Sequence, residues 1–290
     1  MKILILGKNG NIGSFLTRYL KLSKPYKIYS FDKKTVDITN IDDIYKIIYT
    51  YEPNYIINCT AFLNADRCEE YKDISYNVNY KGVVNIAKAI NKIDKNIKFL
   101  HFSTDFVFYG NKKECYKEND IPIPRNIYGL HKYLADECIS NSLENYLILR
   151  VASLLNFKSK NNFAHKIIEL YRRNNEIKLV NDLKISLTTL LLINRFITYI
   201  LDSNILIPGI YNLVSDGKTS WYEIGRYILE KKFKNKVNME NIKKISFKEF
   251  PLKAVRPLNS CLDNSVIKKV YNFNIQSWEE ELDEYCEFIR

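Results

Sequence analysis

The chain has 290 residues, of which 46% are hydrophobic and 27% charged, an ordinary composition for a globular protein with a substantial core. Its longest apolar stretches are only as long as strands, and none reaches the roughly 20 apolar residues that a membrane-spanning helix needs. The formal net charge of +11 comes from basic residues mixed with acids, without a basic helix or a nucleic-acid-binding motif, so we expect no nucleic-acid partner.

The cysteines and histidines give no metal-binding pattern. The six cysteines, at positions 59, 68, 115, 138, 261 and 286, show no Cys-x-x-Cys spacing, and there are only three histidines. Only four apolar residues separate Lys2 from Gly7, so we see no signal-peptide core. We therefore expect no metal site, reduced cysteines and a cytoplasmic setting.

Strands and helices alternate through the first half of the sequence. Short apolar runs predict strands at residues 3–6, 27–31, 55–59, 98–103 and 146–151. Helical spacing of apolar residues predicts helices at 12–22, 41–51, 76–91 and 127–141. Short connections between such elements are typical of a doubly wound parallel sheet, so we expect an α/β fold of the Rossmann type.

The alternation stops near residue 155. The sequence predicts helices at 161–173, 188–201, 221–232 and 278–289, a short strand within 208–214, and a loop at 251–259. We expect an NAD(P)-binding domain at 1–154 and a smaller substrate-binding lobe at 155–290, some of whose elements return to the main sheet.

A glycine-spaced turn, Gly7-Lys8-Asn9-Gly10-Asn11-Ile12-Gly13, lies directly between the first predicted strand and helix. Gly7 permits a tight turn, Gly10 allows the backbone to approach a pyrophosphate, and Gly13 allows close packing of helix and strand. The start of the helix offers free N–H groups to the phosphates. A glycine-rich loop without a ligand is the alternative, but the flanking strand and helix favour dinucleotide binding.

Asp32 ends the second predicted strand, where a carboxylate commonly accepts hydrogen bonds from the adenosine ribose. This favours NADH, but the neighbouring Lys33 and Lys34 could receive the 2′-phosphate of NADPH instead. We therefore expect either NADPH or NADH. Asp37 and Ile38 lie against the adenine or cap the next helix.

Tyr128 and Lys132 are four residues apart in a predicted helix, so they share one face. An ammonium one turn away stabilises a phenolate and brings a phenol, whose usual pKa is about 10, into the range for acid–base work. Thr104 and Asp105 end the fourth strand, where the threonine hydroxyl can hold a substrate carbonyl or simply cap the strand end. His131 lies on a different helical face, and we interpret it as a surface histidine.

Arg256 begins the run Arg-Pro-Leu-Asn-Ser in the second half of the chain. An arginine fork there can grip a diphosphate bidentately. A structural salt bridge is the competing interpretation.

Taken together, these motifs resemble the extended short-chain dehydrogenase/reductases and, within them, the dTDP-4-dehydrorhamnose reductase family. The similarity covers nearly the full length. Besides the motifs above, it includes the segments at 59–69, 161–163, 180–182, 209–213, 219–222 and 256–260. The last four of these segments belong to the narrower family rather than to the superfamily in general.

The resemblance implies reduction of the C4 ketone of a nucleotide-linked 6-deoxy-4-keto-hexose. Tyr128 would protonate the forming alkoxide, Lys132 would tune it and hold the nicotinamide ribose, and Thr104 would orient the ketone, which makes these three the catalytic residues. The expected cofactor-binding residues are Gly7, Gly10, Asn11, Ile12, Gly13, Asp32, Asp37, Ile38, Ala61, Phe62, Leu63, Phe102, Tyr128 and Lys132. The expected substrate-binding residues are Thr104, Asp105, Ser153, Asn162, Arg256 and Asn259.

The chain departs from the family pattern on the substrate side. Arg150 is followed by Val-Ala-Ser-Leu instead of a Thr-Ser-Trp run, and residues 182–188 lack the usual Gln, Gly and Pro. Leu63 stands where a threonine is usual, and Phe15 where some members carry a glutamate that binds Mg²⁺ at a dimer interface. These departures leave open which nucleotide sugar is the substrate.

We expect a nucleotide-sugar 4-ketoreductase of surface-polysaccharide synthesis that acts on a nucleotide-diphosphate sugar, is compatible with a homodimer and needs no membrane. Two alternatives remain at this point. One is a non-reducing relative that binds NADP and regulates a partner enzyme. The other is a nucleotide-sugar epimerase or dehydratase, although Phe106 stands where a dehydratase usually carries a second acid.

Overall fold

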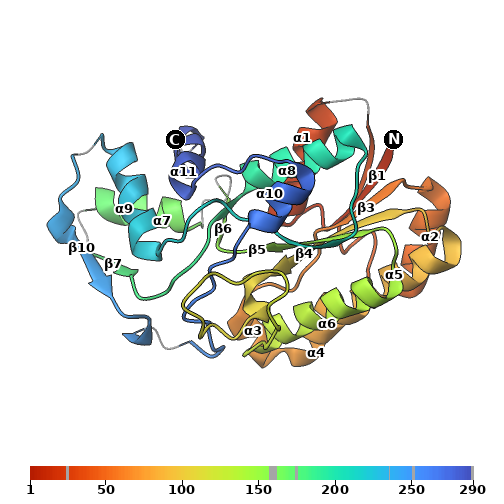
Figure 1. Cartoon of the computed structure of the whole chain (residues 1–290), viewed down its shortest axis with the longest axis horizontal. Coiled ribbons are helices and arrows are strands. Elements are labelled where there is room, and N and C mark those ends of the chain that lie inside the picture. The colour runs from red at the N-terminus through yellow and green to blue at the C-terminus, as the bar shows by residue number, and fades with distance from the viewer. Residues whose placement is uncertain (24–25, 157–161, 174–175, 235, 250–251, 289–290) are drawn as a thin grey trace.

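A six-stranded parallel sheet forms the centre of the computed structural model, which describes residues 1–23, 26–156, 162–173, 176–234, 236–249 and 252–288 (Figure 1). The strand order is β2-β1-β3-β4-β5-β9, and every neighbouring pair is parallel. The strands are β1 (Lys2–Leu6), β2 (Lys27–Phe31), β3 (Tyr55–Asn58), β4 (Lys98–Thr104), β5 (Tyr146–Val151) and β9 (Gly209–Asn212). The predicted Rossmann-type fold is confirmed.

Helices cover both faces of this sheet (Figure 1). On one face lie α2 (Ile41–Tyr51), α5 (Gly82–Ile93) and α6 (Ile127–Ser142), and on the other α1 (Asn11–Ser23) and α8 (Leu190–Ser203). Alternate residues of one strand enter different cores, because Ile3 and Ile5 pack with α1 and α8 whereas Leu4 and Leu6 pack with α2 and α5. Burial on both faces explains why the strands appear in the sequence as continuous apolar runs.

A smaller group of elements lies at the left end of Figure 1. It contains α7 (Phe163–Arg172), α9 (Trp221–Lys232), α11 (Trp278–Glu287) and the parallel pair β7 (Ile177–Val180) and β10 (Ile242–Ile245). A second small pair, β6 (Leu154–Leu155) and β8 (Thr188–Thr189), precedes α8, and α10 (Ser265–Tyr271) precedes α11. The division of the chain at residue 154 stays a prediction.

The helix predicted over 76–91 is more complex than expected. It consists of α4 (Lys72–Tyr76), a π-helical turn η1 (Asn77–Lys81) and α5, and a short helix α3 (Ala65–Glu70) precedes it. Asn79 in the π turn donates to the Phe62 carbonyl at 3.1 Å and accepts from the Phe62 N–H at 2.8 Å. These tertiary bonds to the loop after β3 leave no trace in a hydrophobic pattern. Of the other predicted segments, residues 161, 251 and 289 lie outside the described residues.

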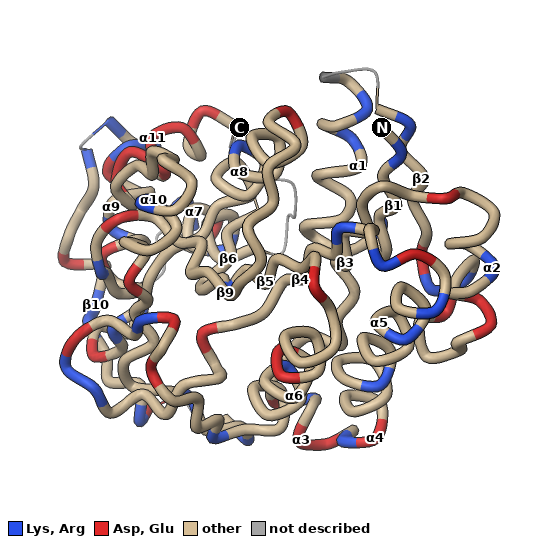
Figure 2. Tube along the Cα trace, turned by 45° about the vertical axis from the view of Figure 1, so that its right-hand side comes forward, with Lys and Arg blue, Asp and Glu red and all other residues tan. Residues whose placement is uncertain are grey.

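Basic and acidic residues are interspersed along the chain trace, as expected from the sequence (Figure 2). Within the part of the chain that the structure describes, none of the helices has the length and apolar character to cross a membrane.

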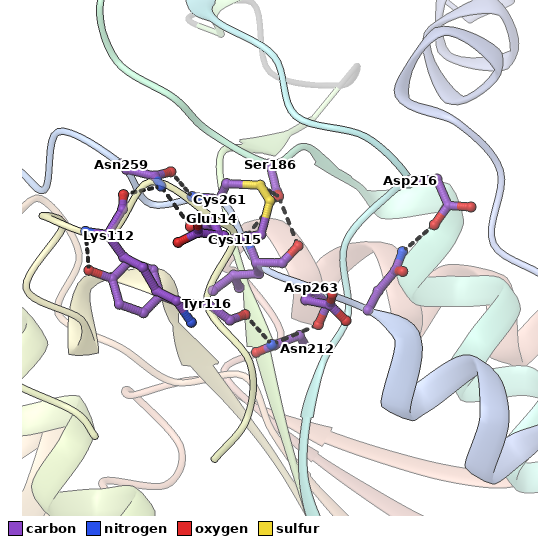
Figure 3. Close-up of a disulfide and its surroundings, with 12 residues drawn as sticks. Lys112, Glu114, Cys115, Tyr116, Ser186, Asn212, Asp216, Asn259, Cys261 and Asp263 are labelled. Carbon is purple, nitrogen blue, oxygen red and sulfur yellow. Dashed lines mark hydrogen bonds between the residues drawn. A yellow bond between two sulfur atoms is a disulfide. The ribbon is translucent and has the colours of Figure 1, made fainter. Parts of the chain in front are cut away.

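Two of the six cysteines form a disulfide, which corrects the expectation that all are reduced. Cys115, in the segment between β4 and α6, pairs with Cys261, with Cα atoms 4.6 Å apart across a sequence separation of 146 residues (Figure 3). Cys59, Cys68 and Cys138 are free, as is Cys286. Spacing along the chain carries no information on such a pair, because only the fold brings the two segments together.

Candidate active site

The predicted site residues converge at the carboxyl ends of β1, β3 and β4. The chain leaves β1 toward β2 on one side, whereas β3 pairs with β1 on the other. This reversal creates a crevice between the ends of β1 and β3, which is where open α/β sheets bind ligands.

The glycine turn is built so tightly that two of its glycines exclude any side chain. Gly7 has a φ of +85°, and a Cβ there would lie 2.9 Å from the Cys59 carbonyl carbon and oxygen at the end of β3. A Cβ on Gly13 would lie 2.2 Å from the Gly7 carbonyl oxygen. A Cβ on Gly10 would lie 3.4 Å from that same oxygen, which is an ordinary contact distance. Packing within the protein therefore does not require glycine at position 10, whereas close approach of a ligand would. The turn and the start of α1 therefore fit a dinucleotide diphosphate.

Asp32, which follows β2, is already engaged by neighbouring groups. Asn9 Nδ2 donates to Asp32 Oδ2 at 2.9 Å, and Lys8 Nζ lies 3.4 Å from the same oxygen. Partial desolvation would raise the pKa of Asp32, but Lys8 and the hydrogen bonds from Thr35 and Asn9 outweigh it and lower that pKa. The carboxylate is thus ionised, and a ribose hydroxyl would have to share it with these donors.

Other predicted cofactor residues differ in their surroundings. Asp37 accepts from the Thr39 N–H and hydroxyl at 3.0 and 2.8 Å, but the residue that caps α2 is Asn40, so the capping alternative for Asp37 is wrong. Ile38 is buried, and its side chain lies close to Gly82. After β3, Leu63 is 53% exposed, whereas Phe102 of β4 is buried in the core. Asn11 Oδ1 accepts from Asn156 Nδ2 at 2.8 Å. Contacts of these residues with a cofactor stay predictions.

Thr104 and Tyr128 meet because α6 begins close against the end of β4. Asn126 caps the helix by accepting from the Gly129 N–H at 2.8 Å. A Cβ on Gly129 would lie 2.1 Å from the Phe106 carbonyl oxygen, so only glycine permits this approach. Thr104 donates to Asp105 Oδ1 at 3.0 Å and accepts from the Phe106 N–H at 3.2 Å, and its hydroxyl lies near enough to Tyr128 to affect the pKa of the phenol.

The pKa of Tyr128 differs from the expectation. Burial raises it, the carboxylate of Asp105 raises it further, and the nearby Thr104 hydroxyl lowers it only in part. From the sequence we expected Lys132 to lower the pKa of Tyr128. That lysine instead places Nζ 2.7 Å from His101 Nε2, and burial lowers the pKa of Lys132 to about 8.

His101 and Asn58 are polar residues of the site that sequence reasoning missed. Both are only 1% exposed, His101 in the middle of β4 and Asn58 at the end of β3. Asn58 Nδ2 lies 3.1 Å from His101 Nδ1. The available signal was a histidine inside the apolar strand Lys-Phe-Leu-His-Phe-Ser-Thr, because a buried polar side chain needs partners.

A cavity of about 350 Å³ opens beside Asp105 and reaches the smaller lobe. Its lining includes Ser153 and Ser260, the Arg256 side chain and the apolar Trp221. Asp105 is 4% exposed, and burial raises its pKa to about 6 against the hydrogen bonds from Ser260 and Thr104. A carboxyl and several hydroxyls in a partly apolar cavity suit a hydroxylated ligand.

The predicted substrate contacts are mostly occupied by structural bonds. Arg256 forms a bidentate pair with Asp66, with nitrogen–oxygen distances of 3.0 and 2.7 Å, as the salt-bridge interpretation held. Asn259 Nδ2 donates to the carbonyl oxygens of Lys112 and Glu114 at 2.7 and 2.8 Å. Asn162 caps α7. Of the predicted substrate-binding residues, Asp105, Ser153 and Arg256 line the cavity, and the substrate roles stay predictions.

His131 is not a surface residue, contrary to the sequence analysis. It is 7% exposed, and its Nδ1 lies 2.9 Å from the Ser75 hydroxyl. Helix α4 packs against the face of α6 that carries His131. His131 is therefore covered, although helical spacing places it away from Tyr128 and Lys132.

Comparison with known proteins identifies the family of the chain. The family model described as "RmlD substrate binding domain" matches residues 1–290. A dTDP-4-dehydrorhamnose reductase of Aggregatibacter actinomycetemcomitans is 29% identical, over 97% of each chain. The spore coat polysaccharide biosynthesis protein SpsK of Bacillus subtilis is 28% identical, over 99% of this chain and 97% of its own.

A solved structure gives the same answer. The crystal structure of dTDP-4-dehydrorhamnose reductase from Bacillus anthracis, in complex with NADP, has a TM-score of 0.89 and 32% identity, over 98% of both chains. Similarity of this extent covers the sheet and the smaller lobe together. The chain therefore belongs to the RmlD substrate binding domain family.

Proposed function

We propose that this protein reduces the C4 ketone of a nucleotide-linked 4-keto-6-deoxy sugar with NADPH or NADH. The observation that carries the proposal is the close approach of the start of α6, which holds Tyr128 and Lys132, to the end of β4, which holds Thr104, at the same edge of the sheet as the glycine turn. The cavity beside Asp105 supplies room for the sugar.

The cofactor would lie along the crevice between β1 and β3. Gly10 and the N–H groups at the start of α1 would hold its diphosphate, and Asp32 its adenosine ribose. Lys33 and Lys34 flank Asp32 and are exposed, so a 2′-phosphate finds cations there. When bound, the nicotinamide supplies the hydride that reduces the ketone carbon.

The protein's own groups move the proton. The Thr104 hydroxyl, which donates to Asp105 in the free protein, would turn to donate to the ketone oxygen and so orient it toward Tyr128. Tyr128 gives its phenolic proton to that oxygen as the carbonyl becomes an alcohol. The resulting phenolate is stabilised by the ammonium form of Lys132. Because Lys132 is buried, water weakens this attraction little.

The names of the relatives support the substrate class. Two of the proteins described above are called dTDP-4-dehydrorhamnose reductase, and the third is named for polysaccharide biosynthesis. We infer a role in surface-polysaccharide synthesis in the cytoplasm. Altered substrate-side residues such as Leu63 leave the nucleotide and the sugar to experiment.

The rival functions are less well supported by the site. A purely regulatory NADP-binding relative has no need of Thr104, Tyr128 and Lys132 in one place. A dehydratase needs a second acid after Asp105, and this chain has Phe106 there. An epimerase would recycle its nicotinamide and consume none.

The test is incubation of the protein with NADPH or NADH and a panel of 4-keto-6-deoxy nucleotide sugars, following the absorbance of the reduced cofactor. We expect stoichiometric oxidation with one sugar. Sugar conversion without net oxidation would indicate an epimerase. Cofactor binding without turnover on the whole panel would favour the regulatory alternative.

A further inference from the structure

Lys132 lies in a hydrogen-bonded chain whose donors and acceptors can be counted. The chain runs from Thr60 to Asn58, His101 and Lys132, and the last three side chains are each 1% exposed. Burial makes an unsatisfied or mismatched polar contact costly, so each atom must have a partner of the right kind.

The orientation of Asn58 is determined by the backbone. The Thr60 N–H, which can only donate, lies 3.1 Å from Asn58 Oδ1, and the Thr60 hydroxyl donates to the same oxygen at 2.6 Å. Asn58 Nδ2 must then face His101 Nδ1, at 3.1 Å. Because an amide nitrogen has hydrogens and no free acceptor, His101 Nδ1 carries no proton.

The state of Lys132 follows from this tautomer. A neutral imidazole with a bare Nδ1 carries its proton on Nε2, which then donates to Lys132 Nζ at 2.7 Å. An ammonium has three donors and no acceptor, so only the neutral amine can receive this bond. A doubly protonated His101 is opposed by Asn58 and by burial, which lowers the pKa of His101 well below its usual value.

The surroundings provide a second place for the charged form. Asp136, one helical turn after Lys132 on α6, is fully buried, and its Oδ2 accepts from Ser103 and lies near Arg150. Its Oδ1 is buried and accepts no hydrogen bond from the described residues. The attraction of Asp136 raises the pKa of Lys132, but burial outweighs it. Tyr128 lies one turn before Lys132 and carries no charge in the free protein, because its pKa is raised.

We propose that Lys132 is held by His101 as a neutral amine in the free protein and takes up a proton, leaving His101, when the dinucleotide binds. This rests on the proposed function, because it assumes that a nicotinamide dinucleotide is the ligand. The ribose hydroxyls and phosphates of the cofactor bring acceptors and negative charge to the site, which favour the ammonium. Tyr128 would then acquire its activating cation only in the cofactor complex.

The experiment measures protons taken up on binding of NADH or NADPH. Titration calorimetry at pH 8.5 in buffers of different ionisation enthalpy gives that number, and this pH lies above the phosphomonoester pKa of about 6. We expect an uptake of about half to one proton by the wild type, because a lysine whose pKa is about 8 is mostly deprotonated at pH 8.5. Lys132→Met should show none.

Asn58→Asp reverses the tautomer with an isosteric change. One carboxylate oxygen keeps the bond from Thr60, while the other accepts from a proton on His101 Nδ1, so that Nε2 accepts from an ammonium already present. We expect this variant to bind the cofactor without proton uptake. Lys98→Met is the matched control, because burial also lowers the pKa of Lys98, which lies at the opposite end of β4 and should not affect uptake.

Nitrogen NMR of the histidine rings reads the tautomer directly and needs no turnover. The chain has only three histidines, so a His101→Gln sample assigns the signals. We expect the Nε2–H tautomer in the free wild type. An Nδ1–H tautomer, or binding of both cofactors without uptake, would overturn the inference even if the ketone reduction is found. Proton uptake without turnover on any sugar would uphold it while the proposed reaction failed, and absence of any dinucleotide binding would overturn both.

Discussion

Breaking the disulfide between Cys115 and Cys261 should destabilise the protein strongly without dismantling the site. The bond closes a loop of 146 residues. The chain-entropy relation for a loop of this size gives a loss of about 17 cal/mol/K in the unfolded chain, or about 5 kcal/mol at 25 °C. Measured values for natural disulfides lie at about 2–5 kcal/mol, so we expect reduction to lower the free energy of unfolding by that amount.

The folded state should change little, because hydrogen bonds join the same two segments (Figure 3). The Tyr116 N–H donates to the Cys261 carbonyl at 2.7 Å, and the Asp263 N–H donates to the Tyr116 carbonyl at 2.8 Å. Asn259 adds two bonds to the carbonyl oxygens before Cys115. The wall of the cavity formed by residues 256–260 is therefore retained, and the affinity for the sugar nucleotide should stay close to that of the oxidised protein.

The assay is urea unfolding with and without dithiothreitol, followed by far-ultraviolet circular dichroism. The wild type should lose stability on reduction, whereas Cys115→Ser should be equally unstable in both conditions. Cys138→Ser, at a free thiol on α6, is the control and should respond to dithiothreitol as the wild type does. An unfolding midpoint of the wild type that does not move on reduction would refute the reasoning.

Two further predictions concern the glycine turn and Asp105. Gly10→Ala should leave the free energy of unfolding nearly unchanged but lower the affinity for NADPH in fluorescence titration. Gly13→Ala should lower both quantities, because its methyl group would overlap the Gly7 carbonyl oxygen. Equal losses for the two variants would count against the proposed diphosphate site at the glycine turn. Burial raises the pKa of Asp105 to about 6, so the folded protein binds the proton more tightly and loses stability as the pH rises from about 4 to 6. Relative to the wild type, Asp105→Asn should therefore gain about 2.5 kcal/mol of stability in urea unfolding between pH 4 and pH 8, an order-of-magnitude figure. An unchanged difference across that range would disprove the assignment.

The parallel sheet was predictable because burial on two faces leaves strand-length apolar runs between amphipathic helices. Gly7 and Gly13 were predictable for a similar reason, since close backbone contact demands glycine at those positions. Thr104 and Tyr128 could be paired because strand ends and the following helix starts meet at one edge of such a sheet.

What could not be predicted depends on contacts between distant segments. The Cys115–Cys261 bond and the Arg256–Asp66 pair each join residues more than 140 positions apart, and local sequence carries no record of them. The partner of Lys132 was missed because its four-residue spacing from Tyr128 indicates a shared helical face, but does not indicate that His101 offers a closer bond from the sheet.

The central claim is that Tyr128 delivers the proton in a ketone reduction, and Tyr128→Phe tests it most directly. The variant removes one hydroxyl from a partly exposed ring, so NADPH should bind with nearly the wild-type dissociation constant. The turnover number should fall by roughly 10²–10⁴-fold, the usual contribution of a positioned general acid. Turnover within a few-fold of the wild type, with the cofactor bound normally, would contradict the account.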